Sequence, residues 1–514
     1  MQKKLLAVAV LSAFSGLAAA QSANVTLYGT LLGDVQMMGA TGGDGSSAAT
    51  GAAPAGANSS VRNFAIIGAP AAGAANLGFA YLNNGGAAVA STFTQAATQS
   101  ARLRMNPAGS NFGVRGTEDL GNGLSAWFQV ELSMTLGGVP TFNVASHANA
   151  PSFRNTGVGL RSNTWGTALI GQWDLPFNVA YARNSTSARA AVPGTTTTGS
   201  LMGNTFLGQG TVSSQDLAQS CTVAGGTAVS PSQCFAAATS FDRRQSQTLQ
   251  WWSPNWNGFD ARVSYSAVGN QFSADNRAGT GKVLPNIWDL SLGYNNGGLD
   301  VIFAYERQKD LIAQAANNLG GAATGAVWSS GVNNGAWRIS TQGTAAAATL
   351  AAGASAITGS QATGYRLGAK YAFSNGFAIS SLWERLTWNM THTTNGVAAV
   401  ADLTQIKKQA WKLGGSYTTG NHFVGLDYYR ANELKGTLGA NALATSAFDG
   451  SGTAARQYVL TYNYMMSKRT SLGGYYNRVN NDSNASYGGQ GFGATSAAAG
   501  QTATTYGLTV RHSF

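Results

Sequence analysis

The sequence has few charged residues, no long apolar run beyond its first 20 residues, and no cluster of metal-binding side chains. Charged residues make up 10% of the 514 residues, against about 25% in soluble domains, which argues against an ordinary soluble protein. No later stretch stays apolar for about 20 positions, so no membrane-spanning helix is expected. The four histidines lie in different segments, and a metal site is therefore not expected.

Residues 1–20 have the organisation of a signal peptide. Lys3 and Lys4 precede a short apolar segment, and Ala18, Ala19 and Ala20 form a cleavage site of small residues. Removal of this segment takes 2 from the 31 basic side chains and leaves 29 against 20 acidic ones, a net charge of +9. We therefore expect a mature, basic, exported protein that begins at residue 21.

The two cysteines, Cys221 and Cys234, lie in one loop-like region. An exported protein meets an oxidising compartment, where a disulfide can form and persist. A bond between them would close a loop of about 14 residues. We expect this disulfide; two free thiols are the alternative.

Glycine is plentiful, with 67 residues, and it marks seven short turns between runs of alternating polar and apolar residues. These turns lie within residues 116–132, 160–173, 251–265, 292–307, 370–385, 415–430 and 462–478. Long stretches rich in Ala, Gly, Ser and Thr separate them. Short turns on one side and long loops on the other are typical of a transmembrane β-barrel.

Counting strands gives an even number, as a closed single-chain barrel requires. Each turn joins two strands, and runs at 25–35 and 502–514 add one strand at each end. The prediction is an all-β fold: a closed antiparallel transmembrane barrel of sixteen strands with long extracellular loops. A soluble β-sandwich is the alternative, but its long loops would not lie on one side only.

The alternation also predicts which side chains face lipid. In the third predicted strand, Leu124 and Phe128 share one face, whereas Trp127 and Glu131 share the other. A cation at the bilayer midplane costs about 2–4 kcal/mol, so Arg262 and Arg511 should face the lumen. Aromatic residues near strand ends are expected in interfacial girdles: Tyr28, Trp251, Phe259, Tyr371, Phe377, Tyr417, Phe423 and Phe514.

The longest connection, residues 174–242, carries both cysteines together with charged residues. A barrel of sixteen strands leaves a water-filled lumen unless something narrows it. We expect this third loop to fold inward; a loop that caps the outside or contacts a neighbour is the alternative.

Four segments, at both ends of the mature chain and between them, carry a family resemblance. They are AQSANVTLYGTLLGDV (20–35), SNFGVRGTEDLGNGLSAWFQVE (110–131), SPNWNGF (253–259) and YGLTVRHSF (506–514). The chain resembles the trimeric general porins of Gram-negative outer membranes, in particular their betaproteobacterial branch. The resemblance spans residues 21–514, and Phe514 looks like the family's barrel-assembly signal.

The resemblance implies a homotrimer in which each third loop, here 174–242, forms a constriction opposite wall arginines. It assigns to that constriction Arg115, Arg154, Arg244, Asp174, Arg183, Arg189 and Asp216. Alternation supports Arg115, and it supports Arg244, which would share a face with Thr248 and Gln250. Arg154 rests on the resemblance alone. Asn111 stands where the family usually has an arginine before Phe-Gly, and Gln172 stands in the GRQ-like position of the fifth strand, so the arginine ladder is thinner than usual. The third loop has few carboxylates and carries Arg183 and Arg189, so it is less acidic than usual.

These features predict an outer-membrane channel for passive diffusion of small hydrophilic solutes and ions, with a preference for anions. A solute-specific porin is one alternative, for which inward-facing Trp127 is the best candidate residue; an adhesin or scaffold is another. No G-x-S-x-G motif or cofactor motif occurs, so no enzyme and no cofactor are expected. Scattered basic residues argue against nucleic-acid binding. Expected partners are membrane lipid, lipopolysaccharide and the barrel-assembly machinery.

Overall fold

The computed structural model describes the barrel and parts of its connections. The described residues are 24–42, 65–67, 99–105, 110–134, 153–184, 201–203, 212–213, 240–267, 285–311, 328–329, 338–339, 361–389, 393–394, 397–398, 403–438, 447–449, 452–482, 485, 487 and 500–514. The predicted signal peptide, residues 1–20, lies outside the described residues. Four other residues named above also lie outside them: Arg189, Asp216, Cys221 and Cys234.

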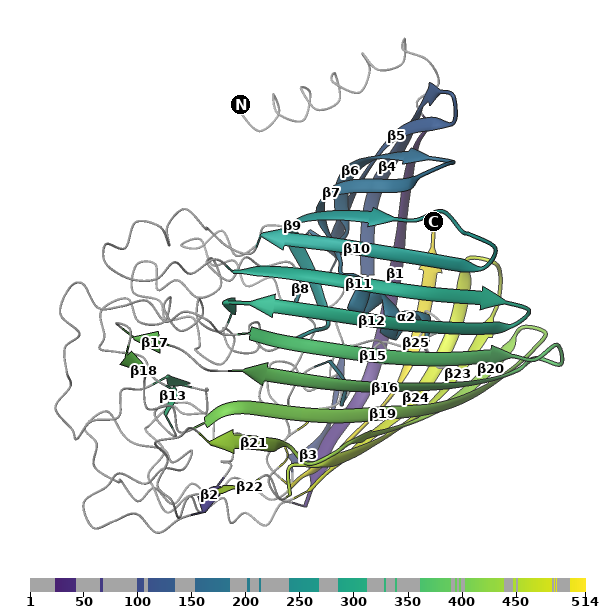
Figure 1. Cartoon of the computed structure of the whole chain (residues 1–514). Coiled ribbons are helices and arrows are strands. Elements are labelled where there is room, and N and C mark those ends of the chain that lie inside the picture. Colours follow the sequence, from purple (N-terminus) through teal and green to yellow (C-terminus); the bar gives the residue numbers. More distant parts are fainter. Residues whose placement is uncertain are drawn as a thin grey trace, which may run out of the picture.

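Sixteen antiparallel strands form the wall, as the alternation predicts. They are β1 (Asn24–Thr41), β4 (Ser110–Gly121), β5 (Leu124–Met134), β6 (Thr156–Ser162), β7 (Gly166–Asp174), β9 (Arg243–Trp252), β10 (Phe259–Ala267), β11 (Asn286–Asn296), β12 (Leu299–Lys309), β15 (Gln361–Ala372), β16 (Phe377–Asn389), β19 (Leu403–Thr419), β20 (His422–Ala431), β23 (Ala455–Met465), β24 (Thr470–Asn481) and β25 (Thr502–Ser513). Figure 1 shows them side by side, joined by short turns at one end.

Shorter strands accompany this wall. Three of them extend the main sheet: β3 (Gln99–Met105), β8 (Val212–Ser213) and β21 (Lys435–Leu438). Three two-stranded ribbons are separate from it: β2 (Ala65–Ile67) with β22 (Ala447–Asp449), β13 (Trp328–Ser329) with β14 (Arg338–Ile339), and β17 (Thr393–Thr394) with β18 (Val397–Ala398). Among the described residues, no helix has the length and apolarity needed to cross a bilayer.

The first and last strands close the barrel. β1 pairs with β25 from Thr30↔Ser513 to Thr41↔Thr502, and Gly29 and Phe514 exchange backbone hydrogen bonds of 3.2 and 3.1 Å. On its other side, β1 pairs with β4 near its start and with β3 near its end. Closure leaves no open edge in the ring, which a barrel in hydrocarbon requires.

Short turns close because their residues accept left-handed backbone conformations. β11 and β12 are joined by Gly297 and Gly298, with φ of 57° and 90°. Two successive residues with positive φ fit the tight hairpin turns that match strand twist. Asn122 and Gly123, between β4 and β5, do the same with φ of 54° and 74°. The predicted turns are therefore hairpins at one end of the barrel.

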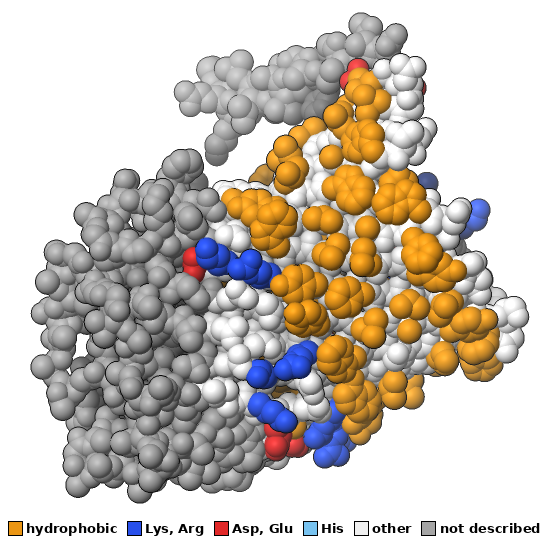
Figure 2. All heavy atoms as spheres, viewed as in Figure 1, with side chains coloured by type: hydrophobic (Ala, Val, Ile, Leu, Met, Phe, Trp, Pro, Cys, Tyr) orange, Lys and Arg blue, Asp and Glu red, His pale blue; other side chains and the backbone are white. Residues whose placement is uncertain are grey.

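The outer face is apolar and the inner face is polar. Leu508 is 74% exposed and Ile170 63% on the outside, where Figure 2 shows a broad hydrophobic surface. On the inside, Asp34, Ser264 and Glu306 are at most 2% exposed. This inversion of the soluble pattern is expected when the exterior solvent is lipid. The predicted inward positions of Trp127 and Arg511 are confirmed by their places between outward residues.

The predicted position in the lipid-facing girdles is wrong for two aromatic residues. Tyr28 hydrogen-bonds Glu131 on the inner face, and Phe423 is 5% exposed on the face that carries Asp427. Strand-end position alone does not reveal the face; the register of the strand decides it. The other aromatic residues predicted for the girdles lie outward: Trp251, Phe259, Tyr371, Phe377, Tyr417 and Phe514.

The outward position of Leu508 gives a test of the wall. Leu508→Arg should lower the free energy of unfolding by about 2–4 kcal/mol, because a charge then lies in hydrocarbon near the middle of β25. The measurement is reversible urea unfolding of the protein folded into lipid vesicles. Leu508→Ala removes the same apolar contact without adding charge and serves as control. Equal losses for both variants would contradict the lipid-facing assignment.

Candidate functional site

The connection after β7 turns into the barrel and forms the helix α2 (Pro176–Arg183). Leu175 is extended, and Pro176 begins the helix, where its missing N–H costs no hydrogen bond. Phe177 and Tyr181 are at most 1% exposed, and α2 contacts β9, β10, β11, β12 and β15. In Figure 1, α2 is seen behind the strands of the wall. We call the described pieces of this connection, 175–184, 201–203 and 240–242, the inward segment.

Arg366 of β15 holds the inward segment to the wall. Its guanidinium pairs with Asp242 at 2.9 Å and with Glu384 at 2.7 Å, and all three side chains are fully buried. It also donates to the carbonyl of Phe177 at 2.8 Å and lies over the Phe177 ring, 4.1 Å from its centre. One cation therefore joins two strands to two pieces of the inward segment.

Neighbouring wall residues add further anchors. The amide of Gly203 donates to Glu384 at 2.8 Å, and Lys408 donates to the carbonyl of Leu201. Farther along, Lys412 donates to the carbonyl of Asn184 at 3.1 Å. Such bonds satisfy loop backbone groups that are buried away from water. The inward segment is thus fastened to the inner faces of β15, β16 and β19.

Arg183, at the end of α2, is paired and does not carry a free charge. Its guanidinium bonds Asp260 at 2.7 Å and Asp300 at 2.6 Å. Gly293 makes room, since a Cβ there would lie 2.2 Å from the Arg183 Nη1 atom. Burial alone would lower the pKa of Arg183, but the bonds and charges of both carboxylates outweigh it and raise that pKa.

The wall at β4–β6, about halfway round the ring from β12 and β15, carries a second charged group. Arg154, just before β6, pairs with Glu131 of β5, and Tyr28 donates to the same carboxylate at 3.0 Å. Arg115 lies over the Tyr28 ring, 5.0 Å from its centre. Arg115 and Arg154, both predicted wall arginines, thus lie together inside the barrel.

A bulge in β9 reverses the face predicted for Arg244. Gly171 pairs with Thr248 but Trp173 pairs with Gln245, so three steps on β9 match two on β7, and Gln247 has φ of 53°. After the bulge, buried Gln245 shares the inner face with Thr248 and Gln250. Regular alternation, which groups Arg244 with Gln250, is therefore wrong here.

Arg244 instead pairs with the end of β7. Arg243 and Gln245 hydrogen-bond each other and share a face, so Arg244 between them takes the opposite one. Its guanidinium lies 3.0 Å from Asp174 and 2.8 Å from the amide oxygen of Asn155. The predicted residues Arg244 and Asp174 are thus brought together beside Asn155, the residue that follows Arg154.

Three tryptophans form a cluster on the inner face that sequence reasoning found only in part. Trp127, Trp173 and Trp252 have ring centres 5.5–6.2 Å apart. Arg161 lies over Trp127, at 5.7 Å, and Arg262 lies over Trp252, at 5.1 Å. Alternation indicates that Trp127 points inward, but only the register of β5, β7 and β9 brings the rings together.

The described lumen wall carries unpaired positive charge. Among the described residues, four inward arginines form no ion pair: Arg115, Arg161, Arg262 and Arg511. The wall carboxylates accept hydrogen bonds or form ion pairs: Asp34, Glu131, Asp174, Asp260, Asp289, Asp300, Glu306, Glu384 and Asp427. No group of three metal-binding side chains occurs in the described part of the chain.

A closed barrel, apolar outside and polar inside, with a connection folded into its lumen, defines a transmembrane β-barrel channel. The family model described as Gram-negative porin matches residues 45–484, and the chain belongs to this family. It is thus a multi-pass protein of the Gram-negative outer membrane that lets small solutes pass by diffusion. A comparison with curated proteins gave no match.

Solved structures include similar barrels. An anion-selective porin from Comamonas acidovorans is 18% identical, with a TM-score of 0.52 over 96% of this chain and 100% of that one. OmpT of Vibrio cholerae is 10% identical, with a TM-score of 0.49 over 97% of this chain and 99% of that one. The DcaP channel of Acinetobacter baumannii is 11% identical, with a TM-score of 0.46 over 96% of this chain and 99% of that one. At these identities, the likeness to the Comamonas porin bears on the fold alone.

The Arg366 anchor gives a second test. Arg366→Met should lower the free energy of unfolding by about 3–5 kcal/mol, because Asp242 is then left buried without a cation and Glu384 keeps only Lys408, at 3.9 Å. The measurement is urea unfolding in vesicles. Lys370→Met, on the inner face of the same strand, makes the same charge change without breaking a described ion pair and is the control. A loss no larger than that of the control would refute the anchoring role.

Proposed function

We propose that the channel prefers anions and that the unpaired inward arginines set this preference. The observation that supports it is that Arg115, Arg161, Arg262 and Arg511 face the lumen and form no ion pair among the described residues. Charged groups that line a pore select ions by sign. The Comamonas acidovorans porin, which shares this fold, is itself described as anion-selective.

We place the constriction between the inward segment and the wall at β4–β6. Arg115 and Arg154 lie on that wall, and Arg183 lies at the end of α2. Arg244 pairs with Asp174 at 3.0 Å and lies on the face of β9 opposite Arg243 and Gln245, so we expect it to have a weaker effect on a passing ion than Arg115 or Arg154. Arg189 and Asp216 stay in the proposal as loop residues that would add to the narrow part.

The remaining expectations on processing and assembly are part of the proposal. Residues 1–20 are removed as a signal peptide, and Cys221 bonds Cys234 within the third connection. Three copies form a trimer in which each barrel keeps its own pore. The barrel-assembly machinery recognises the last strand, which ends at Phe514, and outer-membrane lipid and lipopolysaccharide surround the folded barrel.

Removal of one lumen charge tests the ion preference. A unit charge about 4 Å from a passing ion is worth about 1 kcal/mol in water, or about fivefold. Because Arg115→Gln weakens both anion attraction and cation repulsion, it should lower the anion-to-cation permeability ratio by about fivefold to at most about thirtyfold. Glu131→Gln should raise it. Reversal potentials in a planar bilayer under a potassium chloride gradient measure both. A cation-preferring wild type, or no change in either variant, would refute the proposal.

The tryptophan cluster favours a second candidate, a channel selective for one class of solute. Three indole rings beside Arg161 and Arg262 offer flat apolar faces and positive charge together. An aromatic carboxylate such as benzoate should then interrupt the current more often than acetate, and Trp252→Ala should abolish that difference. Equal effects of benzoate and acetate on the wild type would leave the general channel as the function.

An adhesin or scaffold differs from both candidate channels because it would not need to conduct solutes across the membrane. Liposomes that carry the purified protein should swell in an iso-osmotic sugar solution if the lumen conducts. An adhesin without an open lumen would leave sugar influx at the level of empty liposomes.

A further inference from the structure

The inner face repeats one local unit in three strands: a glycine is followed, two positions on, by an arginine that lies over an aromatic ring. We call these the Gly-x-Arg units. Their guanidinium carbons lie 5.0, 5.7 and 4.1 Å from the ring centres. Given as glycine, arginine and ring, the units are Gly113, Arg115 and Tyr28 in β4, Gly159, Arg161 and Trp127 in β6, and Gly364, Arg366 and Phe177 in β15.

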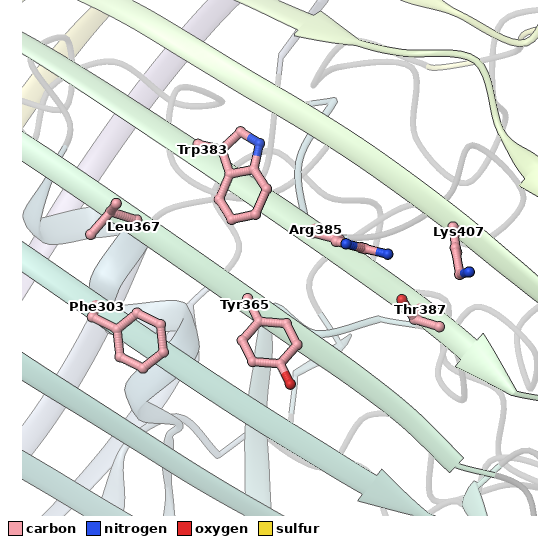
Figure 3. A pocket seen from close by; sticks show the side chains of 7 residues that line it. All are labelled: Phe303, Tyr365, Leu367, Trp383, Arg385, Thr387 and Lys407. Atoms are coloured by element: carbon pink, nitrogen blue, oxygen red, sulfur yellow. The ribbon is translucent and has the colours of Figure 1, made fainter.

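The middle residue of a unit points outward, which places its glycine and arginine on the lumen side. In β15 that residue is Tyr365, which is 41% exposed and lines a groove on the outer face together with Leu367 and Trp383. Figure 3 shows these outward side chains. In β6 the middle residue is Leu160, which is 43% exposed on the outside. The arginines of the units therefore face the lumen.

The glycine of each unit leaves the space that the ring occupies. A Cβ atom at Gly113 would lie 2.5 Å from the Cζ atom of Tyr28, and one at Gly159 would lie 3.0 Å from the Nε1 atom of Trp127. Residues two apart in a strand share a face, so the arginine lies beside the ring that covers its glycine. A guanidinium group stacks on an aromatic face and keeps the N–H groups at its edge available to acceptors.

The β15 unit shows that a stacked arginine can still pair with carboxylates. Phe177 has no hydroxyl group, and Arg366, 4.1 Å from the centre of its ring, bonds Asp242 and Glu384 at 2.9 and 2.7 Å. Stacking alone therefore does not keep an arginine without a partner. The lack of an ion pair at Arg115 needs a further cause.

A carboxylate lies within reach of Arg115. Glu131 of β5 is the direct partner of Gly113, two positions before Arg115, and diagonal neighbours in a sheet are within reach of long side chains. Even so, Arg115 forms no ion pair among the described residues. The positions of the strands would allow this pair, so a side chain must prevent it.

Tyr28 contacts both charged groups. Tyr28, Gly113 and Glu131 form one row across β1, β4 and β5, and the Tyr28 hydroxyl donates to the Oε2 atom of Glu131 at 3.0 Å. Arg154 pairs with the other carboxylate oxygen, Oε1. Both oxygens of Glu131 are thus engaged, while Arg115 lies over the face of the Tyr28 ring.

We propose that Tyr28 is a positioning residue that sets ion selectivity: its ring holds Arg115, and its hydroxyl keeps Glu131 from pairing with that arginine. The N–H groups of Arg115 then stay available to a passing anion, whereas an ion pair with Glu131 would engage them. The inference rests on the proposed anion preference and adds to it an uncharged residue that controls a charged one.

Tyr28→Phe keeps the ring and removes the hydroxyl, so an oxygen of Glu131 becomes free to pair with Arg115. The anion-to-cation permeability ratio should fall by about twofold, less than in Arg115→Gln, because the charge stays in the lumen but lies farther from a passing ion. The measurement is the reversal potential of the mature protein in a planar bilayer under a potassium chloride gradient. An unchanged or higher ratio would overturn the proposal.

Glu131→Gln provides the matched background. A neutral amide cannot form the ion pair, so the addition of Tyr28→Phe to Glu131→Gln should leave the ratio as it is in Glu131→Gln alone. An equal fall in both backgrounds would mean that the hydroxyl has a structural role only, and it would overturn the proposal. Gly113→Ala displaces the ring by another route and should lower the ratio as Tyr28→Phe does; an unchanged ratio would refute the role of the ring.

Failure of this proposal can be distinguished from failure of the anion preference. A wild type that prefers cations would refute the preference, but the effect of Tyr28→Phe is a difference from the wild type and is measurable for either preference. A crystal structure of the Tyr28→Phe variant gives a readout without ion flow: a nitrogen of Arg115 should lie within about 4 Å of a Glu131 oxygen. An Arg115 that stays on the ring without this contact would overturn the proposal.

Discussion

The rest of the structure depends on the hydrogen bonds that join the first strand to the last. In hydrocarbon, an unpaired backbone N–H or C=O finds no water to hydrogen-bond with, so a sheet must close on itself. The pairing of β1 with β25, extended by Gly29 and Phe514, provides that closure. With the backbone satisfied within the ring, the outer side chains are free to be apolar and the inner ones to be polar.

A polar interior changes what holds the chain together inside the barrel. Burial of a lone charge is costly, and the cost falls only when partners are close and well oriented. Arg366, with Asp242 and Glu384, meets this condition, and the same group fastens the inward segment. Arg183 does so at the other end of α2. Charge pairs thus act inside the barrel together with the packed rings of Phe177, Phe241 and Trp388, while arginines without such partners give the lumen its positive field.

Much of the wall could be predicted from the sequence, because side-chain direction in a strand has a period of two. The short turns could be located because they contain glycine and asparagine. The strand number, the closure and the inward position of Trp127 followed from this rule. The rule failed where the period breaks: the bulge near Gln247 exchanges the faces of Arg243 and Arg244. Partnerships such as Arg154 with Glu131, or the three tryptophans, depend on register between strands, which spacing along one strand does not contain. The roles of Arg189 and Asp216 and the bond between Cys221 and Cys234 stay predictions.

Register also explains how one residue type serves two different solvents. Arg366 and Arg385 belong to adjacent strands, β15 and β16, yet one is fully buried among carboxylates inside and the other exposed on the outside. A shift of one residue would exchange such faces along a whole strand, moving lumen charges into lipid and apolar rings into the pore. The apolar band therefore constrains the register strongly, and only near its edge is an outward arginine tolerated. Arg385 lies near that edge, at the end of β16 that leads into a long connection.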